Sequence, residues 1–406
     1  MTERRAPLFS LVLACGVSVA GTAMSALAIP WLVLSTTGSA GRTGVVGFAE
    51  MAPYVLLQVL AGPVVDRIGA KRGCVLGNAV ACVLVCAIPV FHAAGGLSFG
   101  VLVVLVAVGG AVRGMADTAT GPLVPAMAKL GGVPLERAAG LYSGAGRTGL
   151  LLGTPLAGVL VAGAGAPATV LVDGITFGVA AVAVMVLVPA AGSGERPGGF
   201  LAGLGEGLRF IGTDRLLLGI VVLVAATNLL DQALLSVLVP VWIRDRLHDP
   251  ASVGFLGGAS NIGALLGVLL AAWIGHRLPR RAIFSLGYLL GGAPPFLAMA
   301  AFGTLAPVLV ITGLAGLAGG VNNPIIGAVS YERIPEHLQA RVLGAIKASA
   351  WTGIPFGSLL GGALTAGTGL TLALLACGAA MLVVTLAPFV FPAWRQLDRP
   401  GVTSSR

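Results

Sequence analysis

The chain has 406 residues, of which 57% are hydrophobic and only 10% are charged, and its mean hydropathy is +0.99. Soluble domains carry roughly a quarter charged residues, so this composition excludes an ordinary soluble protein and indicates an integral membrane protein. The formal net charge is +9. Because the basic residues are spread over many short segments and form no single patch, nucleic acid is not an expected partner.

Twelve apolar segments are long enough to cross a bilayer, since a helix needs roughly 20 apolar residues to span about 30 Å of hydrocarbon. The predicted fold is therefore an all-α integral membrane protein with twelve transmembrane helices. The predicted spans are residues 8–35, 43–65, 73–93, 97–121, 138–162, 168–189, 213–241, 252–275, 282–302, 305–329, 338–364 and 369–391.

The basic residues predict the orientation of these spans. If the N-terminus is cytoplasmic, 18 of the 24 Lys and Arg residues fall in cytoplasmic segments, and only Arg42, Arg244 and Arg246 fall outside. Short cytoplasmic loops of membrane proteins carry such an excess. We therefore expect a multi-pass protein of the cell membrane with both termini in the cytoplasm.

A short charged segment, called the charged turn below, follows the second predicted helix and runs from Gly62 to Arg72. Charged side chains cost about 3 kcal/mol or more at the bilayer centre, so this segment is expected at the water interface. Gly62 and Gly69 allow a tight turn, and the basic side chains would face water or anionic headgroups. Without further information, the segment could also serve only as a topology anchor.

Polar residues recur every four positions on two predicted helices, so each set falls on one helical face. Such faces are not expected to point into lipid. The two polar stripes are Glu50, Tyr54 and Gln58 on the second helix, and Asn228, Gln232 and Ser236, beside Asp231, on the seventh. We expect both stripes to line one central cavity.

Arg113 and Asp117 lie four residues apart on the fourth predicted helix, so they share a face and can pair. Asp117 falls at the cytoplasmic end of this helix, near the charged turn, and Arg113 lies deeper. Two interpretations remain open at this point. The pair could merely neutralise a buried cation, or Arg113 could control the protonation of a nearby carboxylate.

The composition changes once, at residues 190–212, where a stretch rich in Gly, Ser and Pro cannot span a membrane. Apolar residues between Phe200 and Ile211 then follow helical spacing, which predicts a short amphipathic helix on the inner surface. The predicted domains are a six-helix bundle over residues 1–190, a cytoplasmic linker over 191–212, and a second six-helix bundle over 213–406.

The two predicted bundles repeat each other. A parallel repeat about an axis along the membrane normal is one known plan for a carrier. The charged turn recurs in weaker form at residues 272–281, with His276 in place of Asp66. On the fifth helix of each half, the trio Arg147, Gly153 and Pro155 matches Lys347, Gly353 and Pro355 at an offset of 200.

The charged turn, the twelve spans and the central linker together resemble the major facilitator superfamily. The run Gly62-x-x-x-Asp66-Arg67-x-Gly69-x-Lys71-Arg72 is similar to the signature between its second and third helices. The resemblance implies that this run, with Asp117, forms a conformational latch. In that latch, Asp66 would contact the N-terminus of the eleventh helix, where the helix dipole favours a carboxylate.

Several stretches also resemble the drug:proton antiporter branch that includes macrolide exporters. The fifth-helix stretch is similar to an antiporter motif, although Thr154 departs from the usual small residues. The resembling stretches are Arg113-Gly114-Met115-Ala116, Gly149-x-x-x-Gly153-Thr154-Pro155-x-x-Gly158, Asp173-Gly174-Ile175-Thr176-Phe177, and Glu206-Gly207-Leu208-Arg209-Phe210.

A proton-coupled exporter needs an acid that can lose and regain a proton inside the membrane. Asp231 is the first candidate and Glu50 the second, because both lie away from the cytoplasmic ends of their helices. Each could instead form a static salt bridge to Arg147 or Lys347, and these two cations could instead bind an anionic substrate. The other candidates to line the cavity are Arg113, Asn228, Gln232, Tyr54, Gln58 and Trp351.

These patterns predict a secondary active transporter that exports an amphipathic organic compound or drug in exchange for protons by alternating access. One alternative is a proton-independent facilitator or importer of a lipid or small metabolite, and another is a non-transporting sensor with the same fold. An enzyme is not expected, because no catalytic grouping or phosphate-binding loop is present.

The expected partners are a small-molecule substrate, protons and membrane lipids, and a monomer is expected. The cysteines lie in or beside apolar spans without a CxxC pattern, and the histidines fall in separate loops. The sequence therefore predicts no metal site and no cofactor.

Overall fold

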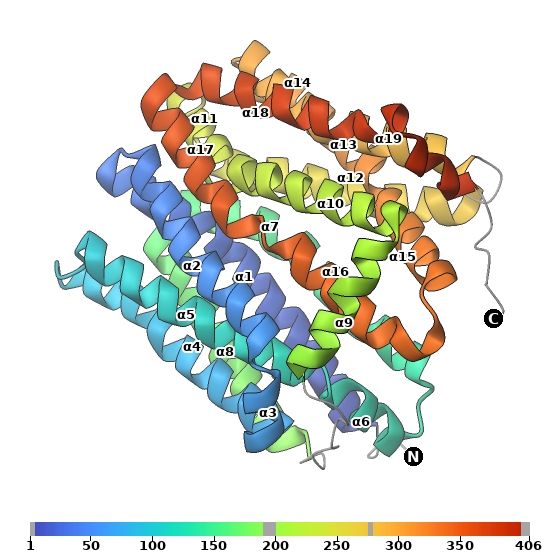
Figure 1. The fold of residues 1–406 in the computed structure, drawn as a ribbon. Coiled ribbons are helices and arrows are strands. Elements are labelled where there is room, and N and C mark those ends of the chain that lie inside the picture. Colours follow the sequence, from blue (N-terminus) through green and yellow to red (C-terminus); the bar gives the residue numbers. More distant parts are fainter. Residues whose placement is uncertain (1–4, 190–199, 275–278, 399–406) are drawn as a thin grey trace. The chain divides into compact units, whose positions relative to one another are not determined.

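In the computed structural model, the described residues are 5–189, 200–274 and 279–398, and every regular element among them is a helix (Figure 1). Eleven described segments are long and apolar enough to cross a membrane. Residues 191–199 of the predicted linker and 275–278 of the second charged segment lie outside the described residues. The chain divides into two compact units, one of Met1–Pro197 with Asp249–Phe255, and one of Gly198–His248 with Leu256–Arg406.

Six of the described segments of membrane-spanning length belong to the first unit. Helix α1 packs against α7 and α8, α2 against α5, and α4 against α5 and α8. The helices are α1 (Ala6–Thr37), α2 (Ala40–Leu60), α3 (Gly62–Ile68), α4 (Ala70–Ala93), α5 (Phe99–Thr120), α6 (Leu123–Gly131), α7 (Leu135–Ala164) and α8 (Ala166–Leu187).

The charged turn is more helical than the sequence suggests, because residues Gly62 to Ile68 form the short helix α3. The chain then changes direction at Gly69, whose φ of 87° is a conformation that favours glycine. Asp66 and Arg67 are exposed, as expected for charges that lie at an interface. The predicted turn is therefore a short helix that ends at Gly69, where the backbone has a positive φ.

The second unit begins with α9 and carries the remaining helices, and the first residues of α12 group with the first unit. Segments α10, η1 and α11 run on as one span, and so do α14 and α15. The elements are α9 (Phe200–Thr213), α10 (Arg215–Ala233), η1 (Leu234–Leu238), α11 (Val239–Arg246), α12 (Ala251–Ile274), α13 (Arg280–Ala301), α14 (Leu305–Gly320), α15 (Asn322–Arg333), η3 (Glu336–Leu338), α16 (Gln339–Trp351), α17 (Ile354–Thr368), α18 (Leu370–Thr385), α19 (Ala387–Val390) and η4 (Pro392–Asp398).

The predicted span 338–364 consists of two shorter helices, α16 and α17. Pro355 lies in the first turn of α17, where proline is tolerated because the first amide groups of a helix have no partner. Its counterpart Pro155 lies inside the continuous helix α7. The two halves therefore differ in helix continuity at this matching position.

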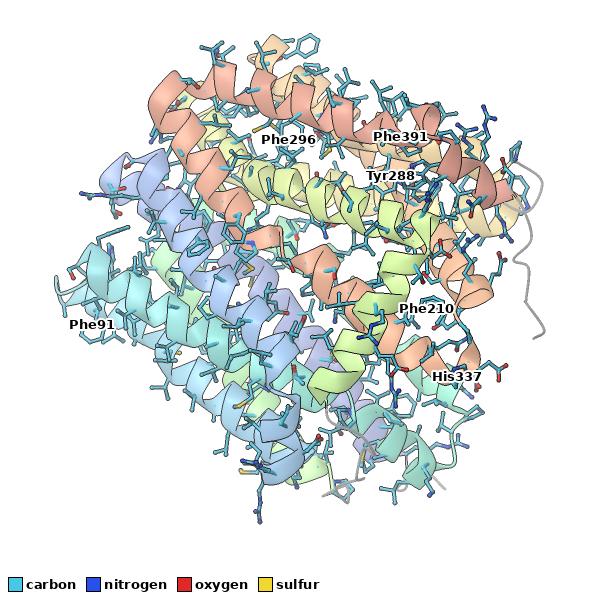
Figure 2. All side chains as sticks on the ribbon, viewed as in Figure 1. Phe91, Phe210, Tyr288, Phe296, His337 and Phe391 are labelled. Atoms are coloured by element: carbon cyan, nitrogen blue, oxygen red, sulfur yellow. The ribbon has the colours of Figure 1, made fainter. Side chains whose placement is uncertain are left out.

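The predicted amphipathic helix is present as α9, and it packs against α16. Leu204, Phe210 and Ile211 belong to an apolar cluster with Val342 and Ala345 of α16. Phe210 of α9 is labelled in Figure 2. Glu206 of α9 also forms an ion pair with Arg341 of α16. Much of the apolar face of α9 is therefore covered by protein.

Glycines bring equivalent helix pairs into close contact in both units. A Cβ atom at Gly149 or Gly153 of α7 would overlap the carbonyl oxygens of Gly16 and Ala20 on α1. Such small residues allow two helix backbones to approach closely. Pro155 lies inside α7, and Gly158 is buried on it. In the second unit, Gly353 and Gly357 meet the carbonyl oxygens of Ala225 and Leu229 on α10 in the same way.

Candidate functional site

A buried ion pair joins α2 to α5 in the first unit. Arg113 Nη1 donates to Glu50 Oε1 at 3.0 Å, and each side chain is only 10% exposed. The guanidinium also lies over the rings of Tyr54 and Phe177, at 5.5 Å from each centroid. A cation held by a carboxylate and two aromatic faces is well compensated away from water.

Next to this ion pair, the polar stripe of α2 forms hydrogen bonds with α5. The Tyr54 hydroxyl donates to Asp117 Oδ2 at 2.8 Å, and Gln58 Nε2 donates to the Tyr54 hydroxyl at 3.1 Å. The Thr118 hydroxyl donates to the carbonyl oxygen of Gln58 at 2.9 Å. The stripe predicted on the second helix is therefore a face that hydrogen-bonds to α5.

Close approach of the two backbones makes this contact possible. A Cβ atom at Gly110 or Gly114 of α5 would overlap the carbonyl oxygens of Glu50 and Tyr54. Glycine at these two positions therefore lets α5 lie directly against the polar face of α2.

Two expectations about ion pairs need correction. Glu50 pairs with Arg113 of the same unit, and not with Arg147 or Lys347, because α5 is the helix that packs on its face. Arg113 in turn pairs across helices to Glu50, while Asp117 accepts a hydrogen bond from Tyr54. Arg113 is thus a buried cation paired with a carboxylate of the neighbouring helix, and its control of the protonation of that carboxylate stays a prediction.

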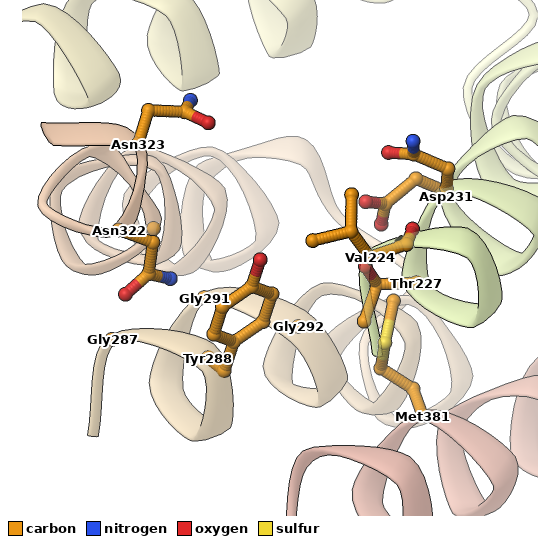
Figure 3. Close-up of a pocket in the computed structure, with 12 residues that line it drawn as sticks. Val224, Thr227, Asp231, Gly287, Tyr288, Gly291, Gly292, Asn322, Asn323 and Met381 are labelled. Carbon is orange, nitrogen blue, oxygen red and sulfur yellow. Dashed lines mark hydrogen bonds between the residues drawn. The ribbon is translucent and has the colours of Figure 1, made fainter. Parts of the chain in front are cut away.

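A cavity of about 190 Å³ lies within the second unit, between α10, α13, α15 and α18 (Figure 3). The Asp231 carboxylate and the Tyr288 hydroxyl are both turned toward this space. The cavity is lined by Val224, Thr227, Asn228, Asp231, Gly287, Tyr288, Gly291, Gly292, Gly319, Asn322, Asn323 and Met381.

Asp231 is the one acid among these lining residues, and none of them is basic. Within the described part of the chain, its carboxylate forms no ion pair of 4 Å or less. A carboxylate inside a membrane bundle is costly to keep charged unless a proton, a cation or a ligand group balances it. The arrangement can therefore bind a proton or a positively charged group.

The other members of the stripe on α10 divide between two neighbours. Asn228 lines the cavity and donates to the carbonyl oxygen of Ala350 at 2.8 Å. Gln232 and Ser236 instead contact the Ser358 hydroxyl of α17, at 3.4 and 3.0 Å. Asn228 therefore faces the cavity of the second unit, Gln232 and Ser236 pack against α17, and the lining of one central cavity by the whole stripe stays a prediction.

The repeated cations Arg147 and Lys347 are exposed on α7 and α16. Lys347 Nζ lies 4.8 Å from the ring centroid of Trp351, one helical turn further along α16. Arg147 forms no ion pair with any residue for which the structure gives a position. Within its own unit, Arg147 therefore forms no ion pair with Glu50, and Lys347 forms none with Asp231.

Sequence reasoning missed several residues of the second-unit cavity. Tyr288 and Met381 come from helices without charged residues in their cores, so no pattern in the sequence indicates them. Asn322 and Asn323 did carry a signal, because two adjacent amides inside an apolar span are uncommon unless they face protein or a cavity. The predicted site residues also do not include Asp173, a buried acid of the first unit.

The curated relatives of this chain include multidrug efflux pumps named Tap. Those of Mycobacterium bovis and Mycobacterium tuberculosis are 31% identical over 404 residues, which cover 98% of this chain and 96% of theirs. The Tap pump of Mycolicibacterium fortuitum is 29% identical over 405 residues, covering 97% and 98%.

Solved structures with low sequence identity share the fold. The nucleoside transporter NupG superposes with a TM-score of 0.75 at 12% identity, covering 96% of this chain and all of that one. A bacterial homologue of the human lysosomal transporter Spinster gives 0.74 at 14% identity, covering 97% and 98%.

The model of the Major Facilitator Superfamily matches residues 11–227 and 221–405, which is nearly the whole chain. This match agrees with the charged turn, the two helical units and the equivalent glycine contacts described above. The protein is a multi-pass membrane protein that belongs to the Major Facilitator Superfamily.

Proposed function

We propose that this protein exports amphipathic organic compounds, including drugs, across the cell membrane in exchange for protons. The relatives named as multidrug efflux pumps match it over almost their full length, which supports export of small molecules. Carriers of this kind work by rocking two bundles about a central site. We also propose the finer placement in the drug:proton antiporter branch that includes macrolide exporters.

Asp231 is the residue on which the coupling part of the proposal depends. Its carboxylate faces a cavity, and no cation among the described residues pairs with it. A group in this position can exchange a proton with water that enters the cavity, and its charge would change with each transport cycle. Glu50 is already neutralised by Arg113 and can take up a proton only if that pair opens.

Several further assignments belong to the same proposal. Both termini lie in the cytoplasm, and the linker over residues 191–212 joins bundles over 1–190 and 213–406. Gly62, Asp66, Arg67, Gly69, Lys71, Arg72 and Asp117 form the latch of the outward-facing state. The protein acts as a monomer with its substrate, protons and membrane lipids as partners.

Reconstitution in liposomes that contain a pH-sensitive dye tests the function. We expect an outward-directed proton gradient, with an acidic vesicle interior, to drive net accumulation of fluorescent lipophilic compounds such as ethidium inside the vesicles, and added compound to dissipate the gradient. Collapsing the gradient with a proton ionophore should abolish accumulation. Transport at the same rate with and without a gradient, with no proton movement, would instead identify a proton-independent facilitator.

A further inference from the structure

Asp173 of α8 is a fully buried acid in the first unit, with none of its surface exposed. Its Oδ1 accepts a long hydrogen bond of 3.4 Å from the Thr176 hydroxyl. Its Oδ2 has no hydrogen-bond partner among the described residues, and neither has the buried hydroxyl of Ser25. A buried carboxylate oxygen with no donor is expensive if the group is ionised.

Asp173 lines the same small cavity as the ion pair of α2 and α5. A cavity of about 10 Å³ is lined by Ser25, Glu50, Arg113 and Asp173 together with apolar residues. This volume is close to the minimum that holds a single water molecule. The Arg113 guanidinium also lies over the ring of Phe177, one helical turn beyond Asp173 on α8.

The charges around this cavity do not balance if both acids are ionised. Its lining contains two carboxyl groups and one guanidinium, and Arg113 is already paired with Glu50. The thiols of Cys82 and Cys86 on α4 also face this part of α8, and neither carries a positive charge.

Among the described residues that line the cavity there is no second cation. Helix α1 presents the hydroxyl of Ser25, and α7, which also packs on α8, contributes no residue to the described lining. When two carboxyl groups share one buried cation, one of them must carry a proton, and the pair titrates as a unit. Among the described residues no donor satisfies Oδ2 of Asp173, so ionisation of Asp173 is the costlier choice while Arg113 is paired with Glu50.

We propose that Asp173 is a second proton-binding residue, and that Asp173 and Glu50 alternate as the ion-pair partner of Arg113. While Arg113 pairs with Glu50, Asp173 holds the proton. When Glu50 takes up a proton, Arg113 turns to an ionised Asp173. The exchange needs no new charge in the bundle, because one proton and one ion pair are present in both arrangements. This proposal deepens the proposed proton coupling and places a proton site in each unit.

Infrared spectroscopy tests the site without any transport measurement. The Asp231→Asn variant serves as the background, so the acid of the second-unit cavity contributes no carboxyl band. At neutral pH, water-exposed carboxyl groups are ionised, since their pKa values lie near 4. We expect one remaining carbonyl stretching band of a protonated carboxyl group, with a shift in deuterated water, and complete loss of this band on adding Asp173→Asn.

A second substitution keeps the proposal testable if Asp173→Asn does not fold. Adding Glu50→Gln to the same background should also remove the band, because Arg113 then pairs with an ionised Asp173. Adding Cys86→Ser, beside the site, should leave the band in place. The proposal is overturned if the background shows no such band, or if the band survives either Asp173→Asn or Glu50→Gln. Failure of Asp231 as the coupling residue would appear in transport assays and leave these spectra unchanged.

Discussion

Glu50 and Asp231 are both acids inside the membrane, but their surroundings differ. Glu50 is held by Arg113 at 3.0 Å, and its side chain is only 10% exposed. Asp231 faces a cavity of about 190 Å³ whose described lining contains no basic residue. An acid that is already paired contributes to the stability of the bundle, whereas an acid that faces an accessible cavity can bind and release a proton.

The pair between Glu50 and Arg113 predicts a specific effect on stability. Replacing Arg113 with Met leaves a buried carboxylate without its cation, and breaking a buried pair in this way costs about 3–5 kcal/mol. We expect this loss in the free energy of unfolding, measured by denaturant titration in detergent above neutral pH. Adding Glu50→Gln to Arg113→Met should restore most of the lost free energy of unfolding, because both charges of the pair are then removed.

The exposed residue Arg147 provides the control for that measurement. Arg147→Met removes the same charge from a position without an ion pair among the described residues, and it should change the free energy of unfolding by no more than about 0.5 kcal/mol. Equal losses for Arg113→Met and Arg147→Met would contradict the structural role of the buried pair.

The sequence predicted which residues of α2 share a face, but not their partners. Glu50, Tyr54 and Gln58 recur every four residues, and helical periodicity alone places them together. Their partners on α5 are 60 or more residues away. Arg147 and Lys347 were equally plausible partners of Glu50, because spacing along one helix does not reveal which helix packs against it.

At the scale of elements, the glycine contacts between α1 and α7 predict that the effect of a glycine-to-alanine substitution on stability depends strongly on its position in α7. A Cβ atom at Gly149 would overlap the carbonyl oxygen of Gly16, whereas nothing lies within 4 Å of a Cβ atom at Gly146 on the same helix. Overpacking typically costs about 1–3 kcal/mol. Replacing glycine with alanine in an open helical position stabilises by about 0.5–1 kcal/mol.

We therefore expect Gly149→Ala to lower the unfolding temperature in detergent and Gly146→Ala to leave it unchanged or raise it. The two variants make the same chemical change three residues apart, so helix propensity alone predicts the same sign for both. Similar shifts in both variants would show that α1 and α7 do not pack as closely as the structure describes.

Helix breaks were harder to predict than helices. Long apolar runs predicted the spans, since only a helix satisfies its own backbone within lipid. The division of the predicted span 338–364 into α16 and α17 was missed, because the same Gly-x-Pro pattern at Gly153 and Pro155 leaves α7 continuous. The local sequence therefore does not decide whether the helix breaks at this position.

For the whole molecule, the distribution of basic residues predicts the orientation in the membrane. We expect Ala94, between α4 and α5, to lie outside the cell and Glu136, at the start of α7, to lie inside; both are exposed. In a variant without native cysteines, a membrane-impermeant thiol reagent should label Ala94→Cys in intact cells. It should label Glu136→Cys only after the membrane is permeabilised. The reverse pattern would contradict the orientation.

The fold was largely predictable from the sequence, and the candidate sites only in part. Composition and apolar length gave an all-helical membrane protein, and the charged turn pointed to its superfamily. The cavity of the second unit combines Asp231 with Tyr288, Asn322 and Met381 from three other helices. Such a set depends on tertiary packing, which no spacing within a single helix encodes.

The central claim is that Asp231 binds the transported proton, and the most direct test is compound accumulation by Asp231→Asn in liposomes under an imposed proton gradient. We predict that this variant still equilibrates the compound down its own gradient but no longer accumulates it when protons flow, while Asp231→Glu retains accumulation. Gradient-driven accumulation by Asp231→Asn at the wild-type level would contradict the account.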